Sequence, residues 1–430
     1  MSSGSKTAQV IALIEDEIVR QLQRILDAPE LQALEGAWRG LHYLVHNCET
    51  NADLQIKVLD VSKRELRRDL ERAVSYDASE LHKKVYHNEQ HVWLGEPYSV
   101  LLADYEFSRL PADVRLLQGL GAIGDHAHVP IVASAQPALL DLESWDDVSD
   151  QPDLAKRMQA GQYMQWRSLR ESEDAKMLFL CVPTVVAKAF DLPALDGIGK
   201  SLFGKPAPDA LDPLLSCKPV RMNASFAAGT IAARCFHDSG WFHEMRRVDT
   251  LGVVRNLPAH RSNAQWDGVQ DASGLKCSSA DAIALYRLGF MPLCRIDEAR
   301  SVFFGYQSVR VVGDFEDTEE EGSRRLASSL PFALMAGRIL HQLSMQQSKG
   351  KERDSVGKHR GRLHDWVQRY VTNTGAAGFN CTRPLLSAHV ELTQREQDND
   401  IRVGLLFIQL RISPGSLPSR GRFRFCVKVV

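Results

Sequence analysis

The sequence predicts a mixed α/β protein with several lobes, a helical hairpin at the amino end and β-strands at the carboxyl end. Three observations support this fold class. Apolar residues recur at three- and four-residue steps over residues 7–26, which indicates an amphipathic helix. Short apolar runs alternate with helical patterns over residues 51–190, as they do in α/β proteins. The last ten residues alternate between apolar and mostly polar positions, which is typical of a half-buried strand.

The region of residues 1–50 is predicted to be helical. The apolar stripe of its first helix consists of Ile11, Ile14, Ile18, Leu22 and Ile25. Pro29 suits the first turn of a second helix that extends to about Val45. Because the connection between the two helices is short, we expect a helical hairpin.

Residues 51–190 are predicted to form an α/β lobe. Leu54, Ile56 and Val58 alternate as a strand does, and Ser62 with Glu65 predicts a capping box that starts a helix to about residue 74. Further strands are predicted over residues 98–103, 129–133 and 177–182, a helix over 111–120, and two helical stretches between 153 and 169.

Residues 191–320 are predicted to form a second lobe with a loop-rich insertion over residues 193–219. This lobe has a helix over 224–236 and short strands at 251–255 and 292–295. Residues 321–430 are predicted to contain long helices, first over 323–345, then a hairpin of residues 388–393 with 401–410, and the terminal strand over 421–430.

The terminal strand is a candidate assembly element. Its apolar face has Phe423, Phe425, Val427 and Val429, and its other face has Arg422, Arg424, Cys426 and Lys428. A strand of this kind can pair within its own sheet or with a neighbouring chain, because a sheet edge presents unpaired N–H and C=O groups. The pattern alone favours pairing within the chain.

The composition excludes several classes of protein. A net charge of -2 argues against a dedicated nucleic-acid binder, and no apolar run reaches the roughly 18 residues of a membrane span. We therefore expect a cytoplasmic protein that contacts neither nucleic acid nor membrane. The eight scattered cysteines predict reduced thiols. An acidic run over residues 314–321 and a basic cluster over 349–362 are most simply solvated surface, although oppositely charged patches also suit head-to-tail assembly.

No catalytic, cofactor-binding or metal site is predicted. Residues 119–124 match the glycine pattern of a dinucleotide site, with Asp141 and Glu143 at the distance of a ribose-binding acid, but the glycines are expected to end a helix instead of opening one. His126 and His128, beside Asp125, lack a readable third metal ligand.

The charged segment Trp166–Asp174 is interpreted as a helix end whose arginines pair with neighbouring acids. A catalytic carboxylate pair within Glu171–Asp174 is the alternative. The spacing of these carboxylates does not favour a catalytic pair.

Seven segments, taken in order, resemble the large subunit of the type VI secretion contractile sheath, a relative of phage tail sheath proteins. The segments are residues 34–45, 95–97 with 102–107, 166–174, 240–241, 256–260, 303–305 and 330–332. The resemblance implies structural roles for five motif residues, which are Trp38, Arg39, Trp166, Arg170 and Glu171.

The resemblance also implies a multi-lobed sheath-like fold and a non-enzymatic role. The large subunit pairs with a small sheath subunit, and the pairs stack in rings around an inner tube on a baseplate, so that contraction drives secretion. Exchanged terminal strands link the rings, and with the family in view we expect the terminal strand to pair between chains. The assembly interface would then include Arg422, Phe423, Arg424, Phe425, Val427 and Val429. An α/β enzyme of unknown substrate, or a sheath protein of another contractile system, is the alternative.

Two departures from the family are expected to matter. Family members usually carry several dozen more residues ahead of the first helix, including a linking strand and the helix that the disassembly ATPase recognises. We therefore expect a short paralogue, with a misassigned gene start as the alternative. The segment from about residue 411 also matches poorly and is unusually basic.

Overall fold

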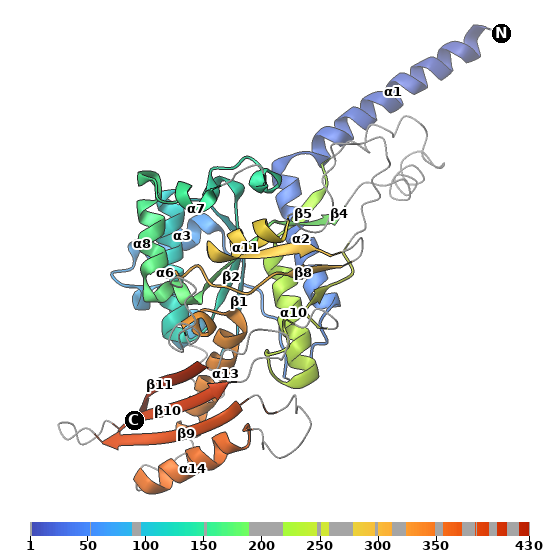
Figure 1. Ribbon diagram of the computed structural model, residues 1–430. Helices are drawn as coiled ribbons and strands as arrows, with labels where there is room; N and C mark the ends of the chain where they lie inside the picture. Colours follow the sequence, from blue (N-terminus) through green and yellow to red (C-terminus); the bar gives the residue numbers. More distant parts are fainter. Residues whose placement is uncertain are drawn as a thin grey trace.

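The computed structural model has a central body, a projecting amino-terminal helix and a separate carboxyl-terminal sheet (Figure 1). The structure describes residues 2–51, 53–87, 96–149, 153–188, 218–246, 251–257, 278–296, 300–311, 324–348, 356–371, 383, 385–394, 402–410 and 421–429. Helices and strands are both well represented, so the predicted mixed fold class is confirmed.

The body is built on a six-stranded sheet with the strand order β1-β2-β3-β7-β8-β6. The strands are β1 (Leu101–Phe107), β2 (Ile131–Ala135), β3 (Leu178–Val182), β7 (Phe290–Arg295), β8 (Ser301–Phe303) and β6 (Val253–Val254). The strands β1, β2, β3 and β7 are parallel to one another, and β8 is antiparallel to both β7 and β6. Every residue of β2 and β3 is buried, as expected for parallel strands covered on both faces.

Two hydrophobic cores lie on the two faces of this sheet. Alternate residues of β3 belong to different cores, since Phe179 and Cys181 face one and Leu178 and Leu180 face the other. The first core is covered by α2 (Pro29–His46), α10 (Ala224–Ser239) and α13 (Leu330–Ser348). The second is covered by α3 (Lys63–Arg72), α6 (Pro111–Ala127) and α8 (Met164–Glu171).

Shorter elements complete the body. They are the helical segments η1 (Tyr76–Ala78), α4 (Glu80–His82), η2 (Lys83–His87), η3 (Pro137–Leu140), η4 (Trp145–Val148), α7 (Leu154–Arg157), η5 (Gly161–Tyr163), η6 (Glu173–Met177) and α11 (Ser279–Arg287), and the two-stranded sheet of β4 (Val185–Lys188) and β5 (Val220–Met222). The helix α11 was not predicted, although Ser278 and Asp281 form a capping box there.

The amino-terminal region is helical, as predicted. It consists of α1 (Ser2–Leu26) and α2, which a short connection through Asp27 and Ala28 joins. Figure 1 shows that α1 points away from the body, whereas α2 lies against it. Most of the apolar stripe of α1 is therefore exposed.

The carboxyl-terminal region contains α14 (Val356–Gln368) and a sheet with the order β11-β10-β9. The predicted hairpin is present as β9 (Leu385–Gln394) and β10 (Arg402–Leu410). The terminal strand β11 (Gly421–Val429) pairs antiparallel with β10 of the same chain, from Gly421 opposite Leu410 to Val429 opposite Arg402. In Figure 1, α14 lies alongside β9.

Two predicted elements are wrong. Residues 54–58 join no sheet in the described structure; Leu54 and Ile56 are partly buried as the alternation suggested, but Val58 is 69% exposed. The helix predicted over 323–345 is interrupted, because Ser329 forms a β-bridge with Gln307 and Pro331 then occupies the first turn of α13. Most of the predicted loop 193–219 lies outside the described residues.

Candidate interaction surfaces

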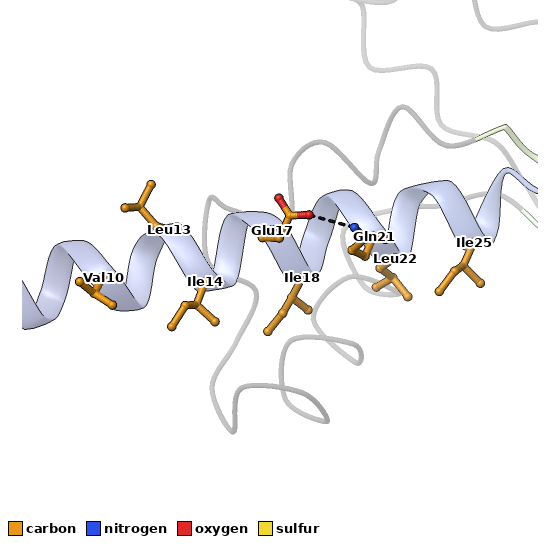
Figure 2. Close-up of a pocket in the computed structure, with 8 residues that line it drawn as sticks. All are labelled: Val10, Leu13, Ile14, Glu17, Ile18, Gln21, Leu22 and Ile25. Carbon is orange, nitrogen blue, oxygen red and sulfur yellow. Dashed lines mark hydrogen bonds between the residues drawn. The ribbon is translucent and has the colours of Figure 1, made fainter.

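Among the described residues, a run of exposed apolar side chains follows α1. Most of its residues recur at three- and four-residue steps and point to one side of the helix in Figure 2, whereas Leu13 points the other way. The exposed members are Val10 (54%), Leu13 (67%), Ile14 (54%), Ile18 (42%) and Ile25 (57%). We call these five residues, with Leu22, the α1 stripe; Ile11, which was predicted to belong to it, is also exposed but lies outside this lining.

Polar side chains beside the α1 stripe satisfy one another within the helix. Arg20 contacts Asp16 and Glu17, each at 3.1 Å, and Gln21 Nε2 donates to Glu17 Oε1 at 2.9 Å (Figure 2). The hydrogen bond from Gln21 and the charge of Arg20 lower the pKa of Glu17. The apolar side chains are therefore the part of α1 that lacks a complementary surface.

The close contact of α2 with the body depends on two glycines. A Cβ at Gly36 would overlap the backbone carbonyl oxygen of Arg221, and a Cβ at Gly40 would overlap the ring of Phe226 in α10. Farther along α2, the Tyr43 hydroxyl donates to the Arg255 carbonyl oxygen at 2.7 Å. These glycines were not predicted to matter, although their G-x-x-x-G spacing is a readable signal of close helix packing.

The motif residues of α2 lie at its surface. Trp38 is 66% exposed, whereas Arg39 Nε donates to Glu35 Oε1 at 2.8 Å. Glu35 also accepts from Lys188 Nζ at 2.9 Å. Partial burial raises the pKa of Glu35, but the hydrogen bonds from Lys188 and Arg39 outweigh it and lower the pKa overall.

Two of the three motif residues of α8, Trp166 and Arg170, are buried. Trp166 is 1% exposed and stacks on Phe290 with ring centroids 6.4 Å apart. Arg170 Nε donates to the Val309 carbonyl oxygen at 3.0 Å, and burial lowers the pKa of Arg170 to about 10. The exposed Glu171 has no ion pair among the described residues. The predicted pairing of these arginines with neighbouring acids is therefore wrong, because Arg170 and Arg167 bond to backbone carbonyl oxygens.

The two histidines considered as metal ligands lie in different surroundings. His126 Nδ1 lies 2.9 Å from His82 Nε2. His128 ends α6 in the left-handed backbone region with φ 55°, and burial, together with His341, lowers the pKa of His128 to about 4. The described part of the chain contains no cluster of three or more residues suited to hold a metal ion.

The glycines of residues 119–124 lie inside α6 and do not end it, contrary to the prediction. α6 continues to Ala127 because these glycines allow close packing: a Cβ at Gly121 would lie 3.1 Å from the Asp174 carbonyl oxygen, and one at Gly124 would lie 2.8 Å from that of Val129. Asp141, the candidate ribose ligand, instead contacts Arg109 at 2.8 Å. The arrangement differs from that of a dinucleotide site, in which the glycines open the helix.

The candidate assembly residues of the terminal strand lie on β11. Arg422, Phe423, Arg424, Phe425, Val427 and Val429 all pair with β10 through the backbone ladder. Their side chains lie outside the described part of the structure. Their role at an interface between chains stays a prediction.

Comparison with known proteins shows what the chain resembles. A family model described as "EvpB/VC_A0108, tail sheath N-terminal domain" (VipB) matches residues 8–310. The "Type VI secretion system sheath protein TssC1" of Pseudomonas aeruginosa is 32% identical over 405 residues, which cover 90% of this chain and 79% of that protein.

Among solved structures, a sheath tail protein from Desulfitobacterium hafniense is similar at 10% identity with a TM-score of 0.31. The match covers 73% of this chain and 60% of that one, which is less than two thirds of its length. Within the described residues, no helix combines the length and the apolar character needed to cross a membrane.

Proposed function

The chain belongs to the VipB/EvpB tail sheath family and is a structural subunit of a contractile sheath, and we propose that it acts as the large subunit that pairs with a separate small sheath subunit. The observation that carries this proposal is the 32% identity to a type VI secretion sheath protein over 90% of the chain. Such pairs would stack as a tube around an inner tube on a baseplate in the cytoplasm. Contraction of the tube would drive secretion.

The α1 stripe supports the need for a partner. Exposed apolar patches on projecting elements mark interaction sites, and an amphipathic helix can pack its apolar face against another helix. Burying one large aliphatic side chain contributes roughly 1.5–3 kcal/mol. The exposed side chains of the α1 stripe can therefore supply a substantial part of the binding free energy of a small subunit.

The carboxyl-terminal sheet supports contacts between copies. Because β10 lies in the middle of the sheet, β11 pairs on one side only within the described structure. The open edge of β11 can receive a strand from another chain, or β11 can leave β10 and join a sheet of a neighbour. In either case the strand would link successive rings.

We also propose that the chain is not an enzyme. Replacing Asp174, His126 or His128 by alanine should change assembly or stability, and neither these replacements nor Glu171→Ala should change any chemical turnover. Nucleotide hydrolysis or a stoichiometric metal in the purified protein, abolished by one of these changes, would contradict this part of the proposal.

Co-expression tests the proposed function directly. Expressed alone, the chain should aggregate or be degraded, whereas expression with a small sheath subunit from the same genome should give a soluble pair and tubes visible by electron microscopy. A chain that stays a well-behaved monomer at high concentration and ignores the small subunit would refute the proposal.

A further inference from the structure

A cleft with basic walls lies between α3 and α6, away from α1 and from the terminal strand. Its lining includes Arg67, Leu70 and Glu71 of α3, Val74 and Tyr76 of the following turn, and Arg115 of α6. The two helices approach closely because residue 119 is glycine; a Cβ there would lie 2.8 Å from Leu70 Cδ1. Leu70 therefore lines the cleft together with Arg67 of α3 and Arg115 of α6.

The positive charge of this cleft is only partly compensated. The acidic residues of α3 are engaged locally: Glu65 accepts from Ser62 in the capping box, and Asp69 accepts from the backbone N–H groups of Glu80 and Leu81. Glu71 lies 3.8 Å from Arg67, at the outer limit of an ion pair. Among the described residues, Arg115 has no ion-pair partner, so the cleft is lined by two arginines and one glutamate. The cleft therefore presents a basic surface.

The mouth of the cleft is also apolar. Val74 is completely exposed and Tyr76 is 40% exposed, directly beside the arginines. A single exposed valine is ordinary on a protein surface. Together with Leu70 and two arginines, however, it makes a site with an apolar centre and cationic flanks, and the matching ligand has an aromatic or aliphatic side chain between carboxylates.

The chain itself carries such a segment. Residues 314–321 read Asp-Phe-Glu-Asp-Thr-Glu-Glu-Glu, so Phe315 lies between Asp314 and Glu316 in a run of six carboxylates. Shortly before this run, the Val311 N–H donates to the carbonyl oxygen of Arg170 in α8 at 2.9 Å. We propose that the cleft between α3 and α6 binds the acidic segment Asp314–Glu321 of a second copy of this chain.

A second copy is the occupant because the proposed sheath repeats one subunit many times. Two complementary patches at different places on one body form a heterologous contact, and such a contact repeats along a helical polymer. The inference rests on the proposed function. It adds a contact between large subunits that uses neither the α1 stripe nor β11, and that salt weakens because its partners are surface charges.

Charge reversal tests this contact in the complex with the small subunit. Arg67→Glu with Arg115→Glu should raise the concentration needed for polymer formation roughly tenfold, as for a loss of about 1.4 kcal/mol per contact. Reversing Asp314 and Glu316 to lysine should do the same, and combining both pairs of changes should restore assembly. The matched control is Arg64→Glu with Arg72→Glu, which reverses the charge of two arginines that do not line the cleft.

The outcomes distinguish a failure of the proposed function from a failure of the proposed contact between copies. Pairing with the small subunit should survive in every variant, so its loss would count against the proposed function and not against this contact. An effect equal to that of the control, or failure of the combined variant to recover, would overturn the contact. Copies carrying Val74→Cys, mixed with differently tagged copies carrying Phe315→Cys, should form a disulfide between the two chains. A disulfide found only within one doubly substituted chain would show that the segment occupies its own cleft, and would also overturn the proposal.

Discussion

Arg170 and Val309, 139 positions apart, are joined by a hydrogen bond of 3.0 Å from the Arg170 Nε to the Val309 carbonyl oxygen. The Val309 N–H in turn donates to the Leu178 carbonyl oxygen at 2.9 Å. One buried side chain thus connects α8 to a segment that is itself bonded to β3. Arg170 is 8% exposed and no carboxylate pairs with it among the described residues, so its contribution is to satisfy backbone carbonyl oxygens.

Replacing Arg170 should therefore destabilise the body. Arg170→Met keeps much of the side-chain volume but leaves the Val309 carbonyl oxygen without its donor, at a cost of about 1–3 kcal/mol in the free energy of unfolding. Chemical denaturation of the purified complex would measure this change. Glu171→Gln, at an exposed neighbour without a described partner, is the control and should change stability by less than about 0.5 kcal/mol. An equal effect of the two substitutions would contradict the assignment.

The α1 stripe should be required for pairing with the small subunit. Ile14→Asp or Ile18→Asp should each weaken co-purification of the small subunit strongly, since each loses roughly 1.5–3 kcal/mol of apolar burial and introduces a charge. Asp16→Ala, which removes an exposed ion pair of α1, should leave pairing nearly unchanged. Undiminished recovery of the small subunit with Ile18→Asp would place its binding site elsewhere.

His128 should make stability depend on pH below neutrality. Burial lowers the pKa of His128 from the ordinary 6.5 to about 4, so as the pH falls from 6.5 towards 4 the unfolded chain binds a proton that the folded chain does not. Stability is full above pH 6.5 and falls within that window by up to about 3 kcal/mol. His128→Asn suits the left-handed backbone at this position and should reduce the fall. Thermal unfolding at pH 7.0 and 4.5 would compare the two proteins, and an unchanged difference would contradict the prediction.

Gly40 should not tolerate a side chain. Gly40→Ala forces the Phe226 ring to move, and overpacking of this kind costs about 1–3 kcal/mol. Gly161→Ala is a matched control, because nothing lies within 4 Å of a Cβ at that position. We expect a lower melting temperature for the first variant only, measured by circular dichroism of the complex. Equal melting temperatures would show that α2 can shift away from α10 without loss.

The terminal strand should be needed for polymers and not for the body. Deleting residues 421–430, or replacing Phe423 and Phe425 by aspartate, should leave the circular dichroism of the α/β body and the pairing with the small subunit intact while abolishing tubes. The reason is that β11 pairs only with β10, in a sheet separate from the six-stranded one. Unfolding of the truncated chain would show that β11 belongs to its own core, and tubes of normal length would show that strand exchange does not link the rings.

The sequence predicted elements well where the pattern was local. The capping box at Ser62 is present with both of its hydrogen bonds, and β3 lies within one residue of its predicted range. Prediction from the sequence failed where tertiary contacts decide the structure. The alternation of residues 54–58 is genuine, but a strand also needs a neighbour to pair with, and none is present in the described part of the chain. Similarly, α6 continues past Gly119 because its glycines are packing surfaces, which no local rule distinguishes from a helix end.

The candidate surfaces were predicted unevenly for the same reason. The α1 stripe follows from periodicity, which the sequence displays directly. The role of Arg170 does not, because its partners are backbone carbonyl oxygens more than 100 residues away, and these carry no side-chain signature. The basic character of the cleft between α3 and α6 could be recognised only after the structure showed which acids are engaged by backbone groups.

The seating of α2 has a mechanical consequence. α1 leaves the body directly from α2, and α2 is held at Gly36 against the backbone of Arg221, at Gly40 against Phe226 and at Tyr43 by a hydrogen bond to Arg255. The helix α1 is therefore attached to the body through a closely packed helix. We therefore expect a displacement of the free end of α1 to be transmitted through α2 to α10 and the main sheet.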